Sequence, residues 1–192
     1  MNKARMEAFS DGVIAILITI MVLELRPPEA ANWHALAPIL PVFLAYVLSF
    51  VFLGIYWANH HHMLQLAEHV NGAILWANLH LLFWLSMVPF VTAWMGEHHT
   101  ESVPTALYGI VLVCAGAAYT ILERALIREE GPKSRLAAAV GADPKALASV
   151  ALYVAAIPLA FYRPLISDVL YALVALTWLV PDRRIEQHMR PS

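Results

Sequence analysis

Residues 5 to 25 of the chain read RMEAFSDGVIAILITIMVLEL. A short polar group, Ser10-Asp11-Gly12, stands at the start of a hydrophobic run that is long enough to enter a lipid bilayer. A carboxylate and a hydroxyl inside a membrane helix cost free energy unless polar partners or water accompany them, so they usually mark a structural or functional site. The stretch therefore predicts a first membrane helix that carries such a site.

The whole chain has the composition of a membrane protein. Of its 192 residues, 60% are hydrophobic and 14% are charged. Soluble proteins average roughly 45 to 50% apolar and about 25% charged residues. The formal net charge is −2, and the basic residues form no single patch, which argues against a nucleic-acid partner. We therefore predict an all-α, polytopic membrane protein whose surroundings are the lipid bilayer.

Six hydrophobic segments of membrane-crossing length follow one another along the chain. They cover residues 4–25, 35–62, 71–96, 104–127, 145–162 and 164–181. Pro158 and Pro164 make the last two the least sharply bounded, because proline kinks or ends helices. The Phe-Ser-Asp pattern of the first segment does not recur in the fourth, so residues 1–192 are expected to form a single six-helix transmembrane domain.

The basic residues predict how the chain is oriented. Lys and Arg are retained in short cytoplasmic loops. Ten of them fall on the side of the N-terminus: Lys3, Arg5, Arg124, Arg128, Lys133, Arg135, Lys145, Arg183, Arg184 and Arg190. Only Arg26 and Arg163 fall on the other side. This distribution predicts that both termini are cytoplasmic.

The first segment has one aliphatic face when it is wound as a helix at 100° per residue. That face holds Phe9, Val13, Ile16, Ile20 and Leu23, with Gly12 and Thr19 on its flank. Asp11 lies nearly opposite. Such a stripe most often serves only for packing. If it faced a symmetry axis in an oligomer, rings of Ile16, Ile20 and Leu23 would form a constriction that excludes water when narrow.

Two polar side chains accompany this stripe. Thr19 would be the one hydroxyl along it able to replace water around an ion. Glu24 would lie at the outer mouth and concentrate cations there. A solvated charge beside Arg26 at a helix end explains Glu24 equally well.

Polar groups on the next two segments lie at the depth of Ser10 and Asp11. The second segment ends in YWANHHH at residues 56–62, and the third begins on the same side of the membrane. The side chains within reach of Ser10 and Asp11 are those of Asn59, His60, Asn78 and His80. Interhelical hydrogen bonds of this kind contribute on the order of 0.6 to 2 kcal/mol each. They would fix the rotation of the first helix.

The sequence offers no arrangement typical of a metal site or an enzyme. The three consecutive histidines His60 to His62 point 100° apart on a helix and do not converge on one ion. A structural hydrogen-bonding role is favoured for them, with proton sensing as the alternative. Neither a His-Glu-x-x-His nor a Gly-x-Ser-x-Gly motif occurs, and Asp11 and Asp168 lie at different depths. We predict no enzymatic activity, no metal site and no cofactor.

Several motifs resemble one known family. The pattern Arg5-x-x-x-Phe9-Ser10-Asp11-Gly12-Val13, then Ala15-Ile16 and a closing Leu23-Glu24, resembles the first-helix signature of the transmembrane protein 175 family, the endolysosomal potassium channels and their prokaryotic relatives. The stretches Trp57-x-x-His60-His61 and Asn78 to Pro89-Phe90 look like further family positions. Animal members carry two six-helix repeats, and this chain has one, like the prokaryotic form.

The resemblance implies a homotetramer with six transmembrane helices per subunit and first helices lining a central pore. By this resemblance the narrow hydrophobic layer falls on Ile16, the next layers on Ile20 and Leu23, and a threonine layer on Thr19. The remaining family positions imply helix packing: Arg5, Phe9, Ser10 and Asp11, with His60 or His61 as partners.

We therefore predict a homotetrameric, potassium-permeable cation channel of a prokaryotic plasma (inner) membrane, gated at a hydrophobic constriction. Potassium and other monovalent cations are the expected permeant partners. A proton or non-selective monovalent cation leak channel is the first alternative. A small secondary transporter with its path inside each subunit is the second, and a membrane scaffold without flux is the third.

Overall fold

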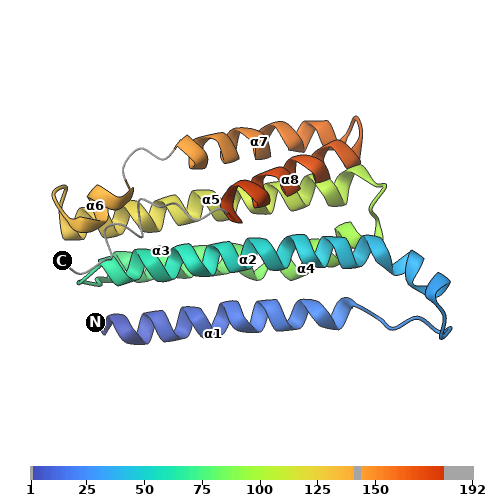
Figure 1. Cartoon of the computed structure of the whole chain (residues 1–192). Helices are drawn as coiled ribbons and strands as arrows, with labels where there is room; N and C mark the ends of the chain where they lie inside the picture. The colour runs from blue at the N-terminus through green and yellow to red at the C-terminus, as the bar shows by residue number, and fades with distance from the viewer. Residues whose placement is uncertain (1, 141–143, 180–192) are drawn as a thin grey trace.

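The computed structural model describes residues 2–140 and 144–179, and the described chain is helical (Figure 1). The α-helices are α1 (Lys3–Met21), α2 (Leu40–Leu66), α3 (Gly72–Ser86), α4 (Val88–Glu97), α5 (Ser102–Glu130), α6 (Arg135–Val140), α7 (Pro144–Ala160) and α8 (Pro164–Leu179). Two short 3₁₀ helices, η1 (Val22–Glu24) and η2 (Trp33–Ile39), follow α1 and precede α2. The all-α prediction is confirmed for these residues.

Within residues 2–140 and 144–179, four helical stretches are long and apolar enough to cross a membrane. They are Lys3–Glu24, Trp33–Leu66, Gly72–Glu97 and Ser102–Glu130, and they match the first four predicted segments. The chain is therefore a multi-pass membrane protein. The apolar helices α7 and α8 have 17 and 16 residues, so each is about 25 Å long against a bilayer core of about 30 Å. Residues 180 and 181 of the sixth predicted segment lie outside the described residues.

The third predicted segment, residues 71–96, is two helices instead of one. Helix α3 ends at Ser86, α4 begins at Val88, and Met87 forms the junction. Pro89 is the cause, because it has no N–H to donate and its ring clashes with the carbonyl of Leu85 one turn earlier. The hydrophobic run continues through Pro89 without an Asp, Glu, Lys or Arg residue, so the hydrophobic pattern alone predicts one helix over residues 71–96.

The order of packing places α1 on one flank of the bundle. Helix α1 contacts α2, α3 and α4, whereas α5 contacts α3, α4, α7 and α8. Figure 1 shows α1 along one side of the molecule and α7 and α8 on the opposite side, beside the part of α5 that begins at Ser102. One face of α1 is therefore packed against the bundle and the other is free in the single subunit.

Basic residues mark one end of the bundle. The Lys3 ammonium at the start of α1 donates to the carbonyl of Ala67 in the α2–α3 turn, at 2.8 Å. Helix α6, with Arg135 at its start, lies at the same end (Figure 1). Three of the basic residues used to predict the orientation lie outside the described residues: Arg183, Arg184 and Arg190.

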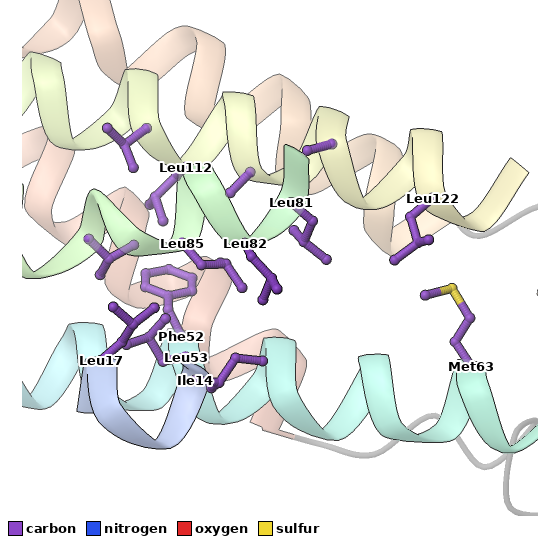
Figure 2. Packing of buried hydrophobic residues seen from close by; sticks show 14 of the residues in the cluster. Ile14, Leu17, Phe52, Leu53, Met63, Leu81, Leu82, Leu85, Leu112 and Leu122 are labelled. Carbon is purple, nitrogen blue, oxygen red and sulfur yellow. The ribbon is translucent and has the colours of Figure 1, made fainter. Parts of the chain in front are cut away.

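Aliphatic and aromatic side chains make up most of the interior between the described helices. Ile14 and Leu17 of α1 meet Phe52 of α2 and Leu85 of α3 in one cluster (Figure 2), and all four are buried. Lipid tails are as apolar as these side chains, so in a bilayer the cluster stabilises the bundle chiefly through close packing.

Two glycines allow helices to approach closely. A Cβ atom at Gly109 of α5 would overlap the hydroxyl of Tyr171 in α8, and Ile157 of α7 lies 3.1 Å from the same position. A Cβ atom at Gly96 of α4 would lie 2.8 Å from the Cα of Val42 in α2. Small residues at such contacts are typical of membrane helix packing.

Candidate functional site

Helix α1 has two distinct faces. The face toward the bundle holds buried residues three or four positions apart: Met6, Ser10, Ile14, Leu17 and Met21. This spacing gives one stripe on a helix. The aliphatic stripe predicted from the sequence lies on the other side of the helix. One stripe of α1 therefore packs against the bundle, and the other faces outward.

The free face of α1 is aliphatic over most of its length. The exposed fractions are 56% for Ile16, 42% for Ile20 and 74% for Leu23. Val13, which the helical wheel placed on the same stripe, is instead partly buried against the core. The stripe is thus narrower than the sequence predicted. Ile16, Ile20 and Leu23 present branched side chains outward, and none of them belongs to the buried core.

Thr19 lies on the free face between two of these aliphatic side chains. Its hydroxyl donates to the backbone carbonyls of Ile16 at 2.9 Å and Ala15 at 3.1 Å. The hydroxyl proton is therefore directed into the helix backbone, and the oxygen lone pairs remain available as acceptors. An oxygen in this state is suited to a cation and not to an anion.

Glu24 stands where α1 gives way to the loop. It is the last residue of the 3₁₀ helix η1, and its side chain is exposed. Leu23 immediately before it is also exposed. The carboxylate and the end of the aliphatic stripe therefore lie together at the end of the bundle away from Lys3.

A buried polar chain ties α1 to α3 and α2. The Asn78 amide donates to the Ser10 hydroxyl at 2.9 Å, and the Asn78 carbonyl oxygen lies 2.8 Å from Nε2 of His60. Ser10 in turn donates to the carbonyl of Met6 at 2.9 Å. Ser10, His60 and Asn78 are all buried. With an acceptor in front of Nε2, His60 carries its proton on that nitrogen.

Asp11 has a partner that the sequence did not identify. The indole N–H of Trp57 in α2 donates to Oδ1 of Asp11 at 3.0 Å. The signal was available, because Trp57 lies one turn before His61 and its N–H is purely a donor. Of the expected partners, His80 accepts from Trp84 instead. Asn59 contributes its backbone carbonyl, which accepts from Tyr119.

A second contact between α1 and α2 lies one turn nearer the start of α1. Oε1 of Glu7 is 3.2 Å from Nδ1 of His61. The His61 ring also stacks on Trp57, with ring centroids 5.9 Å apart. Sequence reasoning missed Glu7, although it is one turn before Asp11 on the same side of the helix. The carboxylates of Glu7 and Asp11 therefore contact His61 and Trp57, which are stacked on each other in α2.

The structure divides the six residues of the predicted packing motif into two groups. Ser10, Asp11, His60 and His61 each contact another helix of the same subunit, as described above. Arg5 and Phe9 are exposed on the free part of α1, and the exposed fraction of Phe9 is 54%. Any packing role for these two residues would involve another molecule or lipid.

The histidines of α2 do not converge on one point, since His60 faces Asn78 and His61 faces Glu7. Over residues 2–140 and 144–179, the metal-ligand type side chains that gather within 4.8 Å are Glu68, His69 and Glu130. Oε1 of Glu130 accepts the backbone N–H groups of Glu68 at 2.6 Å and His69 at 2.7 Å. This carboxylate therefore fastens the α2–α3 turn to the end of α5.

These observations define the class of protein: a multi-pass helical membrane protein whose first helix is held by a polar chain and leaves an aliphatic face free. Residues 5–89 match the family model described as the endosomal/lysosomal potassium channel TMEM175. The chain is 54% identical to a potassium channel of Chryseobacterium sp. (strain P1-3) over 192 residues, which is 100% of both chains. It is 39% identical over 131 residues to a potassium channel of Streptomyces collinus, with 64% of each chain covered.

A solved structure has the same fold. It is the crystal structure of a lysosomal potassium-selective channel TMEM175 homolog from Chamaesiphon minutus. The match has a TM-score of 0.80 and 26% sequence identity, and it covers 95% of this chain and 97% of that chain. The chain belongs to the TMEM175 family, as the sequence motifs predicted. This family is one of ion channels and not of enzymes.

Proposed function

We propose that four copies of this chain form a potassium-permeable cation channel whose central path is lined by α1. The observation that carries the proposal is the pair of faces on α1. One face is fixed to the bundle by Ser10, Asn78 and His60, while Ile16, Ile20 and Leu23 remain free on the flank. The relatives named as potassium channels support potassium as the permeant ion.

The packing inside the subunit favours an ion path between subunits over a path inside each subunit. Transporters with a path inside each subunit place polar sites near the middle of the membrane, where helices are broken. Between α1, α2 and α3 the described interior is packed with side chains such as Ile14, Phe52 and Leu85 (Figure 2). Its buried polar groups Ser10, Asn78 and His60 are hydrogen-bonded to one another, and the atoms that form these bonds are not left free to bind a substrate. This favours an oligomeric pore over the transporter alternative.

In the proposed tetramer the free face of α1 supplies a series of rings. Four Ile16 side chains form the narrow layer, and the Ile20 and Leu23 layers follow about 6 and about 10 Å further along the axis. Aliphatic rings exclude water when they are close together and conduct when they move apart. The four Thr19 oxygens lie between these layers and offer acceptors to a cation.

The remaining features of the proposal concern the membrane. We place both chain termini in the cytoplasm and the protein in a prokaryotic inner membrane, with Glu24 at the outer mouth and α7 and α8 as the fifth and sixth crossings. Helices slightly shorter than the bilayer core are accommodated by local thinning. Residues 1–192 then form one six-helix transmembrane channel domain, and Arg5 and Phe9 contribute contacts at the start of α1.

Two measurements on the purified protein test the proposal. The first is the mass of the protein in detergent, for which a tetramer is expected. The second is flux into proteoliposomes under a potassium, a sodium or a proton gradient in turn. Potassium flux that exceeds the other two supports the proposal. Proton flux or equal potassium and sodium flux would favour a leak channel, and monomers that carry flux would favour a transporter.

A further inference from the structure

We propose that a groove between α2 and α8 binds a phospholipid with a phosphoethanolamine headgroup, with the headgroup at Arg163 and Asp168 and an acyl chain along the two helices. This site is separate from the proposed ion path, because α8 lies on the side of the bundle away from α1 (Figure 1).

The groove is an apolar cavity of about 790 Å³. Small-molecule sites typically measure roughly 300 to 1,000 Å³. Leu44 and Leu48 of α2 line one wall, Ala172 and Leu176 of α8 line the other, and Met95 of α4 lies between them. An occupant of these walls has to be largely hydrocarbon.

The groove is long enough to span one leaflet of a bilayer. The lining residues of α8 run from Pro164 at its start to Leu179 at its end. Fifteen residue steps along a helix span about 22 Å. Half of a hydrocarbon core of roughly 30 Å is about 15 Å. One acyl chain that enters beside Pro164 therefore finds apolar side chains along the full depth of its leaflet.

Among the described residues that line the groove, the polar side chains lie at one end. Arg163 and Asp168 come from the α7–α8 turn and the first part of α8, and His99 and Thr100 come from the α4–α5 turn. Arg163 and Asp168 both line this end of the groove, and no ion pair joins them among the described residues. A cation and a carboxylate at one end of a groove fit a zwitterion, with the lipid phosphate on Arg163 and the lipid ammonium on Asp168. An anionic headgroup without an amine would leave the carboxylate unmatched.

Asp168 shows that a donor is missing at this end. Its Oδ1 atom is buried and has no hydrogen-bond partner among the residues that the structure describes. A buried carboxylate oxygen without a donor costs free energy. The primary ammonium of phosphoethanolamine supplies such a donor, whereas the quaternary ammonium of phosphatidylcholine has no N–H to donate. A preference for phosphatidylethanolamine over phosphatidylcholine therefore tests whether Asp168 accepts a hydrogen bond from the headgroup.

The first experiment titrates the purified, delipidated protein with phosphatidylethanolamine or with phosphatidylcholine of the same acyl chains, and follows the melting temperature. We expect stronger stabilisation by phosphatidylethanolamine. In Asp168→Asn this preference is expected to disappear, with an apparent affinity for phosphatidylethanolamine about 10-fold to 100-fold weaker. Glu97→Gln, which removes an exposed carboxylate at the same end of the bundle, is the matched control and is expected to keep the preference.

The second experiment fills the groove. Ala172→Phe places a ring in the cavity and is expected to abolish stabilisation by both lipids, while Leu173→Phe on the exposed neighbouring face keeps it. Equal effects of the two lipids on the unmodified protein would overturn the assignment of the headgroup. Loss of the oligomer in Ala172→Phe, measured as a change in mass, would assign the groove to a second copy of the chain and overturn the proposal.

Discussion

Removal of the Asn78 side chain tests how firmly α1 is held in its rotation. Asn78→Ala deletes the hydrogen bond to Ser10 and the hydrogen bond to His60, which measure 2.9 and 2.8 Å. Interhelical hydrogen bonds in membranes contribute about 0.6 to 1.7 kcal/mol each, and an unsatisfied buried donor costs about 1 to 3 kcal/mol. Together these terms predict that the free energy of unfolding falls by about 2 to 6 kcal/mol.

The assay is unfolding of the purified protein in mixed micelles, followed by tryptophan fluorescence. A double-mutant cycle of Ser10→Ala and Asn78→Ala isolates the pair and is expected to give a coupling energy of about 0.6 to 2 kcal/mol. His80→Ala is the matched control on the same helix, because His80 is exposed and its described hydrogen bond joins it to Trp84 of the same helix. Its expected effect is below about 0.5 kcal/mol.

The reasoning would be refuted by an Asn78→Ala variant as stable as the His80→Ala control. A coupling energy of zero in the cycle would show that the Ser10 and Asn78 side chains do not act together. In that case the rotation of α1 would depend on apolar packing alone, and the polar chain would not explain which face of the helix is free.

Three further predictions concern single contacts. Gly109→Ala is expected to lower the free energy of unfolding by about 1 to 3 kcal/mol, because its Cβ overlaps Tyr171, and the same unfolding assay measures it. Trp57→Phe keeps an aromatic ring beside His61 but removes the indole N–H that donates to Asp11 together with part of the ring system, so a loss of at least about 0.6 kcal/mol is expected. Glu24→Gln is expected to reduce single-channel potassium conductance at low salt, and a difference that persists in about 1 M salt, where the Debye length is about 3 Å, would contradict a role in concentrating cations.

The faces of α1 were largely predictable from the sequence. A helical period and a hydrophobic run of bilayer length placed Ile16, Ile20 and Leu23 on one side, and the free face in the structure holds them. Depth in the membrane also predicted that Ser10 lies near Asn78, because α1 and α3 both begin at the same end of the bundle. These properties depend on local geometry, which the sequence specifies directly.

Contacts that depend on side-chain direction were not predictable to the same degree. Both Trp57 and His80 lie at a suitable depth, yet only Trp57 faces α1, because the rotation of each helix is set by tertiary packing. The break at Met87 followed from Pro89, but a kinked helix and two separate helices have the same hydrophobic pattern. The groove between α2 and α8 is lined by residues that are distant in the sequence, so no local sequence pattern predicts it.

The central claim is that the free face of α1 meets the permeant ion, and Ile16→Asn tests it most directly. An amide in the proposed narrow layer is expected to wet the constriction and raise basal potassium flux into proteoliposomes, with the tetramer intact. Leu173→Asn, the same kind of change on the exposed face of α8, is the control and is expected to leave flux unchanged. Unchanged flux in an intact Ile16→Asn tetramer, or an equal rise in the control, would contradict the account.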